Sequence, residues 1–244
     1  MTLREYRRKR DFQRTPEPDA DTTVARGDAR RGGRYVVHRH RSRRLHYDLR
    51  LEIGGSLASW AVPRGPSLDP TAKRLAIQVE DHPLSYFGFE GVIPTGQYGG
   101  GDVIVWDQGL WTPDPDQPDA IASLAAGELK ILLEGEKLHG AFVLVRTDGW
   151  AKSDRSKRKW LLIHRRDPAA VADWDADDYP YSVTTGRTND EVAAGKAPTD
   201  VHRLHASTSS PISGSRPTSR PAACDSRPNE EASRKAHPPA SLLK

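Results

Sequence analysis

The side chains best suited to chemistry lie on one predicted strand, residues 46–53. Polar and apolar residues alternate along His46-Tyr47-Asp48-Leu49-Arg50-Leu51-Glu52-Ile53, which indicates a half-buried strand whose successive side chains point to opposite faces. The apolar residues and Tyr47 are expected to face a core, so the other face presents His46, Asp48, Arg50 and Glu52. An imidazole and a carboxylate on one strand face can share a cation, and a neighbouring guanidinium can hold a phosphate.

A third candidate metal ligand, His40, lies on a predicted strand over residues 34–40. With His46 and Asp48 it makes a set of two imidazoles and one carboxylate. Such a set leaves positions on a six-coordinate ion for water and substrate oxygens. Spacing alone leaves a second interpretation open, because histidines inside an arginine-rich run also contact nucleic acid or solvent.

The same alternation recurs over residues 74–82. It sorts Leu75, Ile77 and Val79 inward, and it sorts Arg74, Gln78, Glu80 and His82 outward. If both strands belong to one closed sheet with their polar faces turned toward each other, they enclose a pocket. Arginines and a divalent cation offset the charge that builds on a phosphate in its transition state, so this pocket would suit phosphoryl chemistry. The alternative is an ordinary amphipathic strand with a solvated face.

A series of motifs then follows in a fixed order along the chain. The longest are Arg44-Leu45-His46-Tyr47-Asp48-Leu49-Arg50-Leu51-Glu52 and Val79-Glu80-Asp81-His82-Pro83-Leu84-Ser85-Tyr86, and the others span residues 37–40, 59–67, 89–94, 96–99, 103–107 and 159–164. Together they resemble the 3′-phosphoesterase domain associated with bacterial ligase D. The resemblance covers residues 4–168 and is silent beyond residue 197.

The resemblance implies a manganese-dependent enzyme that acts on a primer strand ending in ribonucleotides. Such an enzyme first removes the terminal nucleoside, which leaves a 3′-phosphate, and then hydrolyses that phosphate to a 3′-hydroxyl. The implied cofactor is Mn²⁺, with other divalent transition metals such as Co²⁺ as substitutes. The implied partners are DNA or RNA–DNA 3′ ends in a primer–template, together with an end-joining ligase, polymerase or end-binding protein. The expected location is cytoplasmic, and nucleoid-associated during repair.

The resemblance also implies roles for individual residues. His40, His46 and Asp48 correspond to metal ligands; the catalytic set is His82, Tyr86, Arg50 and Glu80; the substrate-binding set is Arg10, Asp11, Glu17, His38, Arg64 and Arg74. Family members usually carry Gln at the position of His38 and Lys at that of Arg64. An arginine keeps the charge but forms a planar fork, so the phosphate geometry can shift. His38 either adds a nitrogen near the metal or donates to substrate.

Composition agrees with a cytosolic protein that meets nucleic acid. The single cysteine, Cys224, excludes an internal disulfide framework, and it has no identifiable local base that would make it a nucleophile. The sequence contains no apolar run long enough to span a membrane, and its first residues are too charged for a signal peptide. Residues 1–47 hold 14 lysines and arginines against 6 acidic residues, whereas residues 48–197 hold 16 against 23. A basic leader beside an acidic body predicts that the leader makes local contacts with the phosphates of a nucleic-acid backbone. The alternative for the basic residues at 39–44 is a run of charges that is merely solvated.

The fold class is predicted as mainly β, a compact β-barrel with one or two short helices. The pair Gly54-Gly55 predicts a hairpin, and further strands are expected at residues 103–106, 130–133, 141–146 and 160–164. Short helices are expected at residues 119–126, between Asp119 and Gly127, and at a capping box that opens at Thr188. The predicted organisation is a leader over residues 1–30 that folds back over the site, a barrel over 31–170, an extension over 171–197 and a disordered tail over 198–244.

Two negative observations narrow the function. The glycine cluster at residues 96–101 lacks the spacing of a nucleotide-binding loop, so it is predicted to be a turn in which the backbone approaches another group closely. The segment Thr147-Asp148-Gly149 lacks the lysine of a nucleotidyl-transfer ligase, so the chain shows no ligase of its own. Two hypotheses remain: a metal-dependent 3′-end phosphoesterase, or a non-catalytic module that binds nucleic-acid ends.

Overall fold

The computed structural model describes residues 3–19, 32–147 and 158–198. The chain divides into two units, Met1–Thr208 and Ser209–Lys244, and all described residues belong to the first. The predicted disordered tail begins at the last described residue, so that prediction and the one for Cys224 lie outside the described residues. None of the helices in the described ranges is long and apolar enough to cross a membrane.

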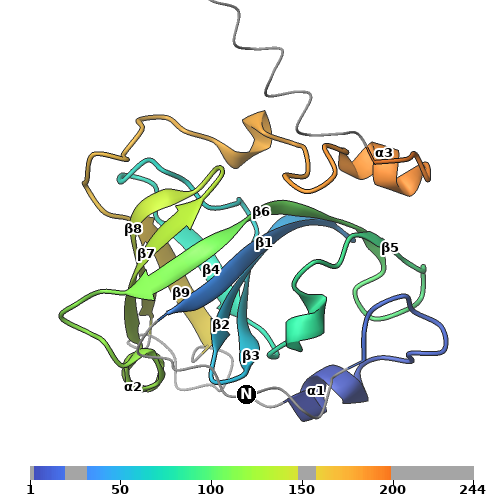
Figure 1. Ribbon diagram of the computed structural model, residues 1–244, viewed down its shortest axis with the longest axis horizontal. Coiled ribbons are helices and arrows are strands. Elements are labelled where there is room, and N and C mark those ends of the chain that lie inside the picture. The colour runs from blue at the N-terminus through green and yellow to red at the C-terminus, as the bar shows by residue number, and fades with distance from the viewer. Residues whose placement is uncertain (1–2, 20–31, 148–157, 199–244) are drawn as a thin grey trace, which may run out of the picture. The chain divides into compact units, whose positions relative to one another are not determined.

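The described chain forms one antiparallel sheet that closes on itself. Its strands are β1 (Gly33–Arg41), β2 (Leu45–Ile53), β3 (Ser56–Val62), β4 (Arg74–Gln78), β5 (Gly91–Ile93), β6 (Gly101–Pro113), β7 (Glu128–Gly135), β8 (His139–Arg146) and β9 (Lys159–His164). The order is β1-β2-β3-β4-β9-β8-β7-β6-β5, and β1 also pairs with β6. That pairing closes eight strands into a barrel, with β5 attached to β6 outside the ring (Figure 1). The prediction of a mainly β barrel is confirmed.

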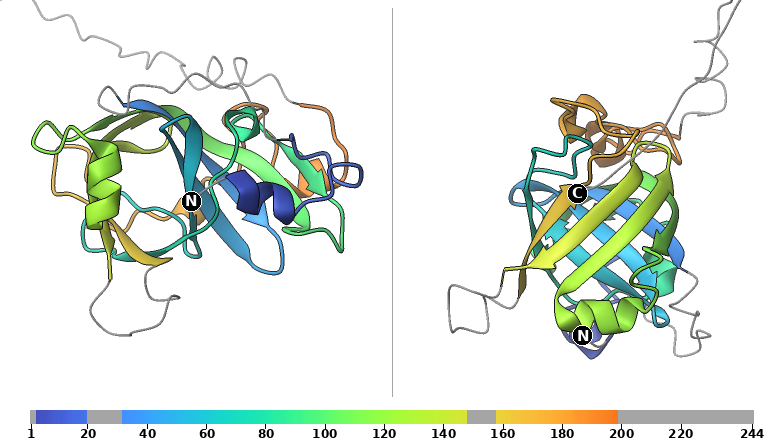
Figure 2. Two further views of the ribbon diagram at one scale, coloured as in Figure 1. Left: turned by 90° about the horizontal axis from the view of Figure 1, so that it is seen from below. Right: turned by 90° about the vertical axis from the view of Figure 1, so that its left-hand side faces the viewer.

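Within the described ranges, three short α-helices flank the barrel. They are α1 (Leu3–Arg8), α2 (Ala120–Ala126) and α3 (Asn189–Ala193). The predicted helix after Asp119 is confirmed, because the Asp119 side chain accepts from the backbone of Ala122, and Gly127 ends the helix in the left-handed conformation with φ 92°. The predicted capping box is also present between Thr188 and Glu191, at the start of α3. The helix α1 was not predicted. The left view of Figure 2 shows α1 (dark blue) and α2 (green) as separate helices at the edge of the barrel.

The core of the barrel is built from large aromatic side chains and the inward faces of the strands. Trp60, Trp106, Trp111 and Trp160 are all buried, and the rings of Trp60 and Trp160 meet edge to face with centroids 5.9 Å apart. Aromatic side chains of this size remove the most apolar surface from water per residue, so they dominate the stabilisation of the barrel. In β2 the inward residues are those predicted, since Tyr47, Leu49, Leu51 and Ile53 are all buried in this core.

The turn between β2 and β3 is the predicted hairpin. Gly54 and Gly55 join the strands with φ values of 61° and 85°. Two successive positive φ values suit a tight turn whose twist matches the flanking strands, and glycine adopts them without steric cost. This turn places Ser59 of β3 directly opposite Arg50 of β2, which matters for the site.

The predicted phase of the alternation in β4 is wrong. Leu75 is 41% exposed, whereas Ala76 is fully buried in the core. Ala76 lies opposite Trp160, and Arg74 lies opposite the buried Leu162, so Arg74, Ala76 and Gln78 share the interior face. The reason is steric and polar: the small side chain of Ala76 leaves room for the indole of Trp160, whose Nε1 donates to Gln78 at 3.2 Å. Local periodicity could not show this, because both partners come from distant strands.

The segment after β9 returns to the barrel and packs against it. Trp174, Ala176 and Val192 belong to the same core cluster as the barrel strands. The backbone of Val183 donates to Val105 of β6 at 3.0 Å, and Glu90 accepts from Ser182 and Arg187, both at 2.7 Å. The predicted extension over residues 171–197 therefore contributes side chains to the core of the barrel.

Candidate active site

A cavity of about 820 Å³ lies against the polar face of β2. Its walls come from β1, β2, the segment after β4, the leader and the glycine-rich loop at residues 94–101. Nine of the thirteen predicted site residues line it: His40, His46, Asp48, Arg50, Glu80, His82, Tyr86, Arg10 and Glu17. The barrel thus brings together most of the side chains that the sequence had placed on separate segments.

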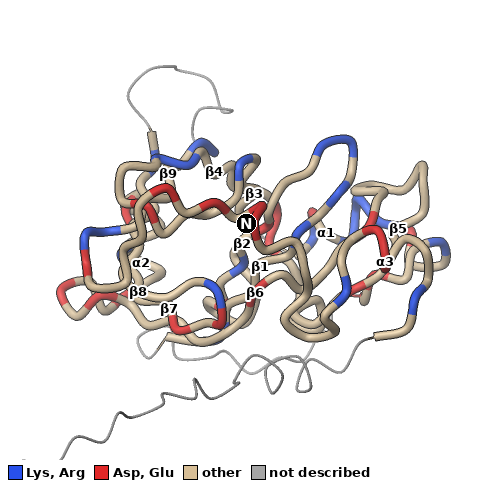
Figure 3. The backbone as a smooth tube through the Cα atoms, turned by 90° about the horizontal axis from the view of Figure 1, so that it is seen from above, with Lys and Arg blue, Asp and Glu red and all other residues tan. Residues whose placement is uncertain are grey.

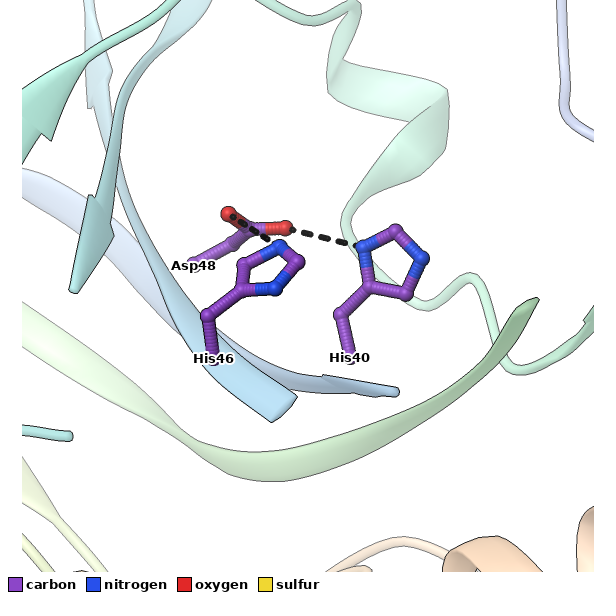
Figure 4. A group of neighbouring side chains, drawn as sticks. All are labelled: His40, His46 and Asp48. Atoms are coloured by element: carbon purple, nitrogen blue, oxygen red, sulfur yellow. Dashed lines mark ion pairs between the residues drawn. The ribbon is translucent and has the colours of Figure 1, made fainter. Parts of the chain in front are cut away.

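The three candidate metal ligands converge at the mouth of the β1–β2 ladder. His40 and His46 lie directly opposite each other in the strand register, and Asp48 follows two residues along β2 on the same face (Figure 4). The Asp48 carboxylate lies 3.6 Å from His40 Nδ1 and 3.6 Å from His46 Nε2. All three ligand atoms lie within 4.8 Å of one another. Separations of 3.6 Å fit donors that each sit about 2 Å from a common ion.

Backbone carbonyls hold both imidazoles in the orientation that a cation requires. His40 Nε2 lies 2.8 Å from the carbonyl oxygen of Gly99, and His46 Nδ1 lies 3.0 Å from that of Arg44. A carbonyl can only accept, so the proton of each neutral ring resides on the nitrogen facing it. The remaining nitrogens, His40 Nδ1 and His46 Nε2, then direct lone pairs toward Asp48. This is the arrangement by which metal-binding histidines are usually oriented.

Asp48 is held as a carboxylate. Burial alone would raise its pKa, but the guanidinium of Arg50 is the largest of the interactions that lower that pKa far below the ordinary range. Arg50 NH2 donates to Asp48 Oδ2 at 3.0 Å. A buried, ionised carboxylate beside two correctly oriented imidazoles is the donor chemistry that Mn²⁺ and similar divalent ions bind. The residues present therefore fit a divalent cation.

Arg50 is the centre of a buried polar network. Its side chain is almost fully buried, and it donates to His38 Nδ1 at 3.2 Å, to Ser59 Oγ at 3.0 Å and to Asp48. Its NH1 also lies 2.9 Å from His82 Nδ1. A guanidinium held by several partners loses little additional freedom when an anion arrives. Arg50 is thus positioned beside both the metal candidates and His82.

His82 lies between two arginines and is kept neutral. Its Nδ1 lies 2.9 Å from the Glu80 carbonyl oxygen, and its Nε2 lies 3.2 Å from Arg10 NH2. Burial, together with the positive charges of Arg50 and Arg10, lowers the pKa of His82 well below its ordinary value. A neutral imidazole next to two cations can accept or donate a hydrogen bond at a phosphate without adding to the positive charge.

The leader folds back over the cavity, and electrostatic contacts hold it there. Arg10 bridges Glu17 at 2.9 Å and Glu80 at 3.2 Å, and Lys9 Nζ lies 2.8 Å from Glu80. Burial would raise the pKa of Glu80, but its contacts with Lys9 and Arg10 and a backbone hydrogen bond together lower that pKa. Figure 3 colours the basic positions blue and the acidic positions red along the backbone, including those of α1. Asp11 does not share in this network, since it is exposed and accepts from the backbone of Gln13.

Three further predicted residues lie away from the cavity surface. His38 is fully buried beneath Arg50, and its ring meets that of Tyr86 edge to face at 5.5 Å. Arg64 is exposed beyond the end of β3. Arg74 is on the interior face of β4, where its NH2 lies 3.9 Å from Asp175. None of the three lines the cavity, so their assignment to substrate binding stays a prediction drawn from the resemblance.

Sequence reasoning missed four residues of this site. Lys9 and Ser59 belong to the network described above, and Arg43 and Tyr98 line the cavity. Helical spacing could have separated Lys9 from Arg7 and Arg8, because Lys9 follows the buried Tyr6 by three residues, which places both on one face of a helical turn. Arg43 and Tyr98 lie in turns, where no periodicity distinguishes a cavity residue from an exposed one.

Helix α3 supports the strand that carries His40. Arg39 NH1 donates to the Asn189 side-chain oxygen at 2.7 Å, and Asn189 Nδ2 lies 3.2 Å from the Arg39 carbonyl and 2.7 Å from the Asp102 carboxylate. Arg39 alternates with His40 on β1, and Asp102 lies in β6, so Asn189 joins the two strands from the side opposite the cavity.

We therefore expect Asn189→Ala to reduce the free energy of unfolding by about 1–3 kcal/mol, because buried partners lose their hydrogen bonds. We also expect Mn²⁺ binding to weaken, since β1 carries His40. Chemical denaturation and calorimetric titration would measure the two effects. Asp190→Ala is the matched control, because this neighbouring side chain is 84% exposed and pairs with Arg41 at the surface; its effect should stay below about 1 kcal/mol. Equal effects of the two substitutions would contradict a supporting role for Asn189.

Comparison with known proteins agrees with this geometry. The profile of the DNA Ligase D 3'-phosphoesterase domain family matches residues 38–146. The chain is 52% identical over 168 residues to the multifunctional non-homologous end joining protein LigD of Pseudomonas aeruginosa. This alignment covers 69% of the present chain and 19% of that protein. The chain is also 43% identical over 147 residues to the LigD of Mycobacterium tuberculosis, in an alignment that covers 60% of the present chain and 18% of that protein. The matched region thus spans about a fifth of the length of these relatives.

Proposed function

The chain belongs to the family of ligase D 3′-phosphoesterase domains, and from this premise we propose that it is a manganese-dependent hydrolase of 3′ ends in end-joining DNA repair. The observation that carries the proposal is the convergence of His40, His46 and Asp48 in one cavity with Arg50 and His82. A module that only bound nucleic-acid ends would not require oriented metal ligands beside a neutral histidine.

The proposed reaction has two hydrolytic steps. In the first, water adds to the phosphorus of the terminal phosphodiester, and the bond to the 5′-oxygen of the last ribonucleoside breaks. The nucleoside leaves with a 5′-hydroxyl, and the primer keeps a 3′-phosphate. In the second, water adds to that phosphate and inorganic phosphate leaves, so the primer ends in a 3′-hydroxyl that a ligase can use.

The side chains of the cavity suit both steps. His40, His46 and Asp48 would hold the divalent cation, which when bound supplies a Lewis acid for a phosphoryl oxygen. Arg50 and Arg10 lie on either side of His82, so a phosphate in this region meets two guanidinium groups that stabilise negative charge. His82 then contacts a nonbridging oxygen or moves a proton at the breaking phosphorus–oxygen bond. Tyr86 packs edge to face against His82 at 4.9 Å and keeps its ring in place.

Hydrolysis of a labelled primer–template with one 3′ ribonucleotide tests the proposal. With Mn²⁺ we expect two successive products, first the primer with a 3′-phosphate and then the primer with a 3′-hydroxyl. Chelation of the metal should stop both, because the same three ligands serve both steps, and Co²⁺ should restore turnover at least in part. A folded protein that binds the primer end but yields neither product with either metal would instead be a non-catalytic end-binding module.

The names of the similar proteins suggest which molecules this chain would act with. Their name describes multifunctional non-homologous end joining proteins, and the matched region is a small part of each. We propose that this chain prepares DNA or RNA–DNA 3′ ends for an end-joining ligase, polymerase or end-binding protein.

A further inference from the structure

The glycine-rich loop at residues 94–101 forms a wall of the cavity, and the proposed chemistry uses only the Gly99 carbonyl of this loop, which orients His40. Gly96, Gly99 and Gly101 have φ values of 89°, 76° and 145°, which other residues rarely adopt, so the glycines set the path of the loop. The carbonyl of Gly99 faces His40 Nε2 at 2.8 Å. The loop is therefore held at a fixed position relative to the candidate metal ligands.

Tyr98 presents an aromatic surface on this wall. Its side chain is 46% exposed although it lines the cavity. Lys9 Nζ lies 4.7 Å from the centroid of the ring and 3.2 Å from its hydroxyl, and the Arg10 guanidinium lies 5.4 Å from the centroid. Two cations thus hold the phenol in place while nearly half of its surface stays open. A rigid ring with an open surface is a platform on which a nucleobase can stack.

A continuous series of contacts connects Tyr98 to the proposed phosphate region. His82 contacts Arg10, Arg10 contacts Glu80, Glu80 contacts Lys9, and Lys9 contacts the Tyr98 hydroxyl. Arg10 also lies 5.4 Å from the centroid of the Tyr98 ring, so a single side chain connects His82 with Tyr98, which precedes Gly99 in the loop. The cavity, about 820 Å³ in volume, lies within the range of pockets that enclose a small organic ligand, about 300–1,000 Å³. It has room for a nucleoside beyond the phosphate.

We propose that Tyr98 forms the subsite for the terminal nucleoside, with the nucleobase stacked on its ring. This inference rests on the proposed function and adds to it the part of the substrate that leaves. In the first step a nucleoside lies beyond the scissile phosphate, whereas in the second step nothing does. Tyr98 is thus a binding residue for the phosphodiester and is not needed for the 3′-phosphate.

Three primers separate these roles: one ending in a ribonucleoside, one ending in an abasic ribose and one ending in a 3′-phosphate. We expect Tyr98→Ala to lower kcat/KM for the ribonucleoside primer by about tenfold or more, since a lost base–aromatic stack has an effect of that order. Most of the loss should appear in KM. The abasic and 3′-phosphate primers should be cleaved at the wild-type rate. Tyr98→Phe keeps the ring and should retain activity on all three.

The matched control is Tyr181→Ala. Tyr181 is also exposed, at 42%, but it does not line the cavity, so all three rates should be unchanged. Two outcomes would overturn the subsite: an equal loss on the ribonucleoside and 3′-phosphate primers, which would make Tyr98 only a support for Lys9 and Arg10, or no loss at all.

Failure of the proposed function can be distinguished from failure of the Tyr98 subsite, because without hydrolytic activity the wild type would cleave none of the three primers. Equilibrium binding of the ribonucleoside and abasic primers, measured by fluorescence anisotropy, would still decide the subsite. Tighter binding of the ribonucleoside primer that disappears in Tyr98→Ala would support it. Equal affinities in the wild type would exclude it.

Discussion

His46→Ala and Asp48→Ala are expected to abolish both hydrolytic steps while the barrel stays folded. Each substitution removes one of three convergent donors, and a Lewis acid at a phosphoryl oxygen contributes several kcal/mol to a transition state. Both rates should therefore fall by about a thousandfold or more, and calorimetric Mn²⁺ binding should weaken in parallel. The fold should survive His46→Ala, because His46 is partly exposed at the start of β2 and contacts the Arg44 carbonyl there.

Asp48→Ala carries one additional consequence. It leaves Arg50 without its carboxylate partner inside the protein, and an unpaired buried charge is costly. Asp48→Asn keeps the size and part of the hydrogen bonding, so this variant separates loss of the metal from loss of folding. His139→Ala is the control for removal of a histidine, since His139 is exposed and lies outside the cavity. Near-normal turnover by a folded His46→Ala protein would remove His46 from the metal site.

His82→Ala is expected to separate catalysis from metal binding. The His82 ring contacts Arg50, Arg10 and Ser59, and it is not one of the three convergent donors. Loss of a group that acts in proton transfer or at a charged oxygen typically costs about 10²–10⁴ in rate, so both steps should slow by that order. Mn²⁺ affinity measured by calorimetry should stay close to that of the wild type.

Two companion variants sharpen this test. His82→Gln keeps a hydrogen-bonding side chain but cannot exchange a proton as an imidazole does, so recovery of activity would indicate a hydrogen-bonding role. Tyr86→Phe keeps the ring that packs against His82 and removes only the hydroxyl, so any rate loss reports a direct part for that hydroxyl. A His82→Ala protein that turned over normally, or that failed only because it no longer bound manganese, would refute the role assigned to His82.

The polar face of β2, which carries His46, Asp48 and Arg50, could be predicted because it depends on local pattern, whereas most of the other site residues came from the resemblance. The alternation in residues 46–53 correctly placed Tyr47 and Leu49 in the core and Asp48 and Arg50 on the polar face. A strand has a period of two residues whatever its neighbours are, so the faces of one strand can be worked out from its own residues. The hairpin at Gly54-Gly55 and the caps of α2 and α3 were predictable for the same reason.

The tertiary structure decided what depends on distant partners. Which residues of β4 face the interior depended on the pairing with Trp160. The position of Lys9 depended on its ion pair with Glu80. Which ring nitrogens of His40 and His46 carry the proton depended on two carbonyl groups. Each of these pairings except the one between His46 and Arg44 joins residues from separate segments of the chain.

By itself, then, the sequence determined which residue types are available and which face of β2 carries them. Only the closed barrel, with the leader folded across it, determined which of those side chains meet, because hydrogen bonds and ion pairs act over a few ångströms and the chain must first bring their partners within that range.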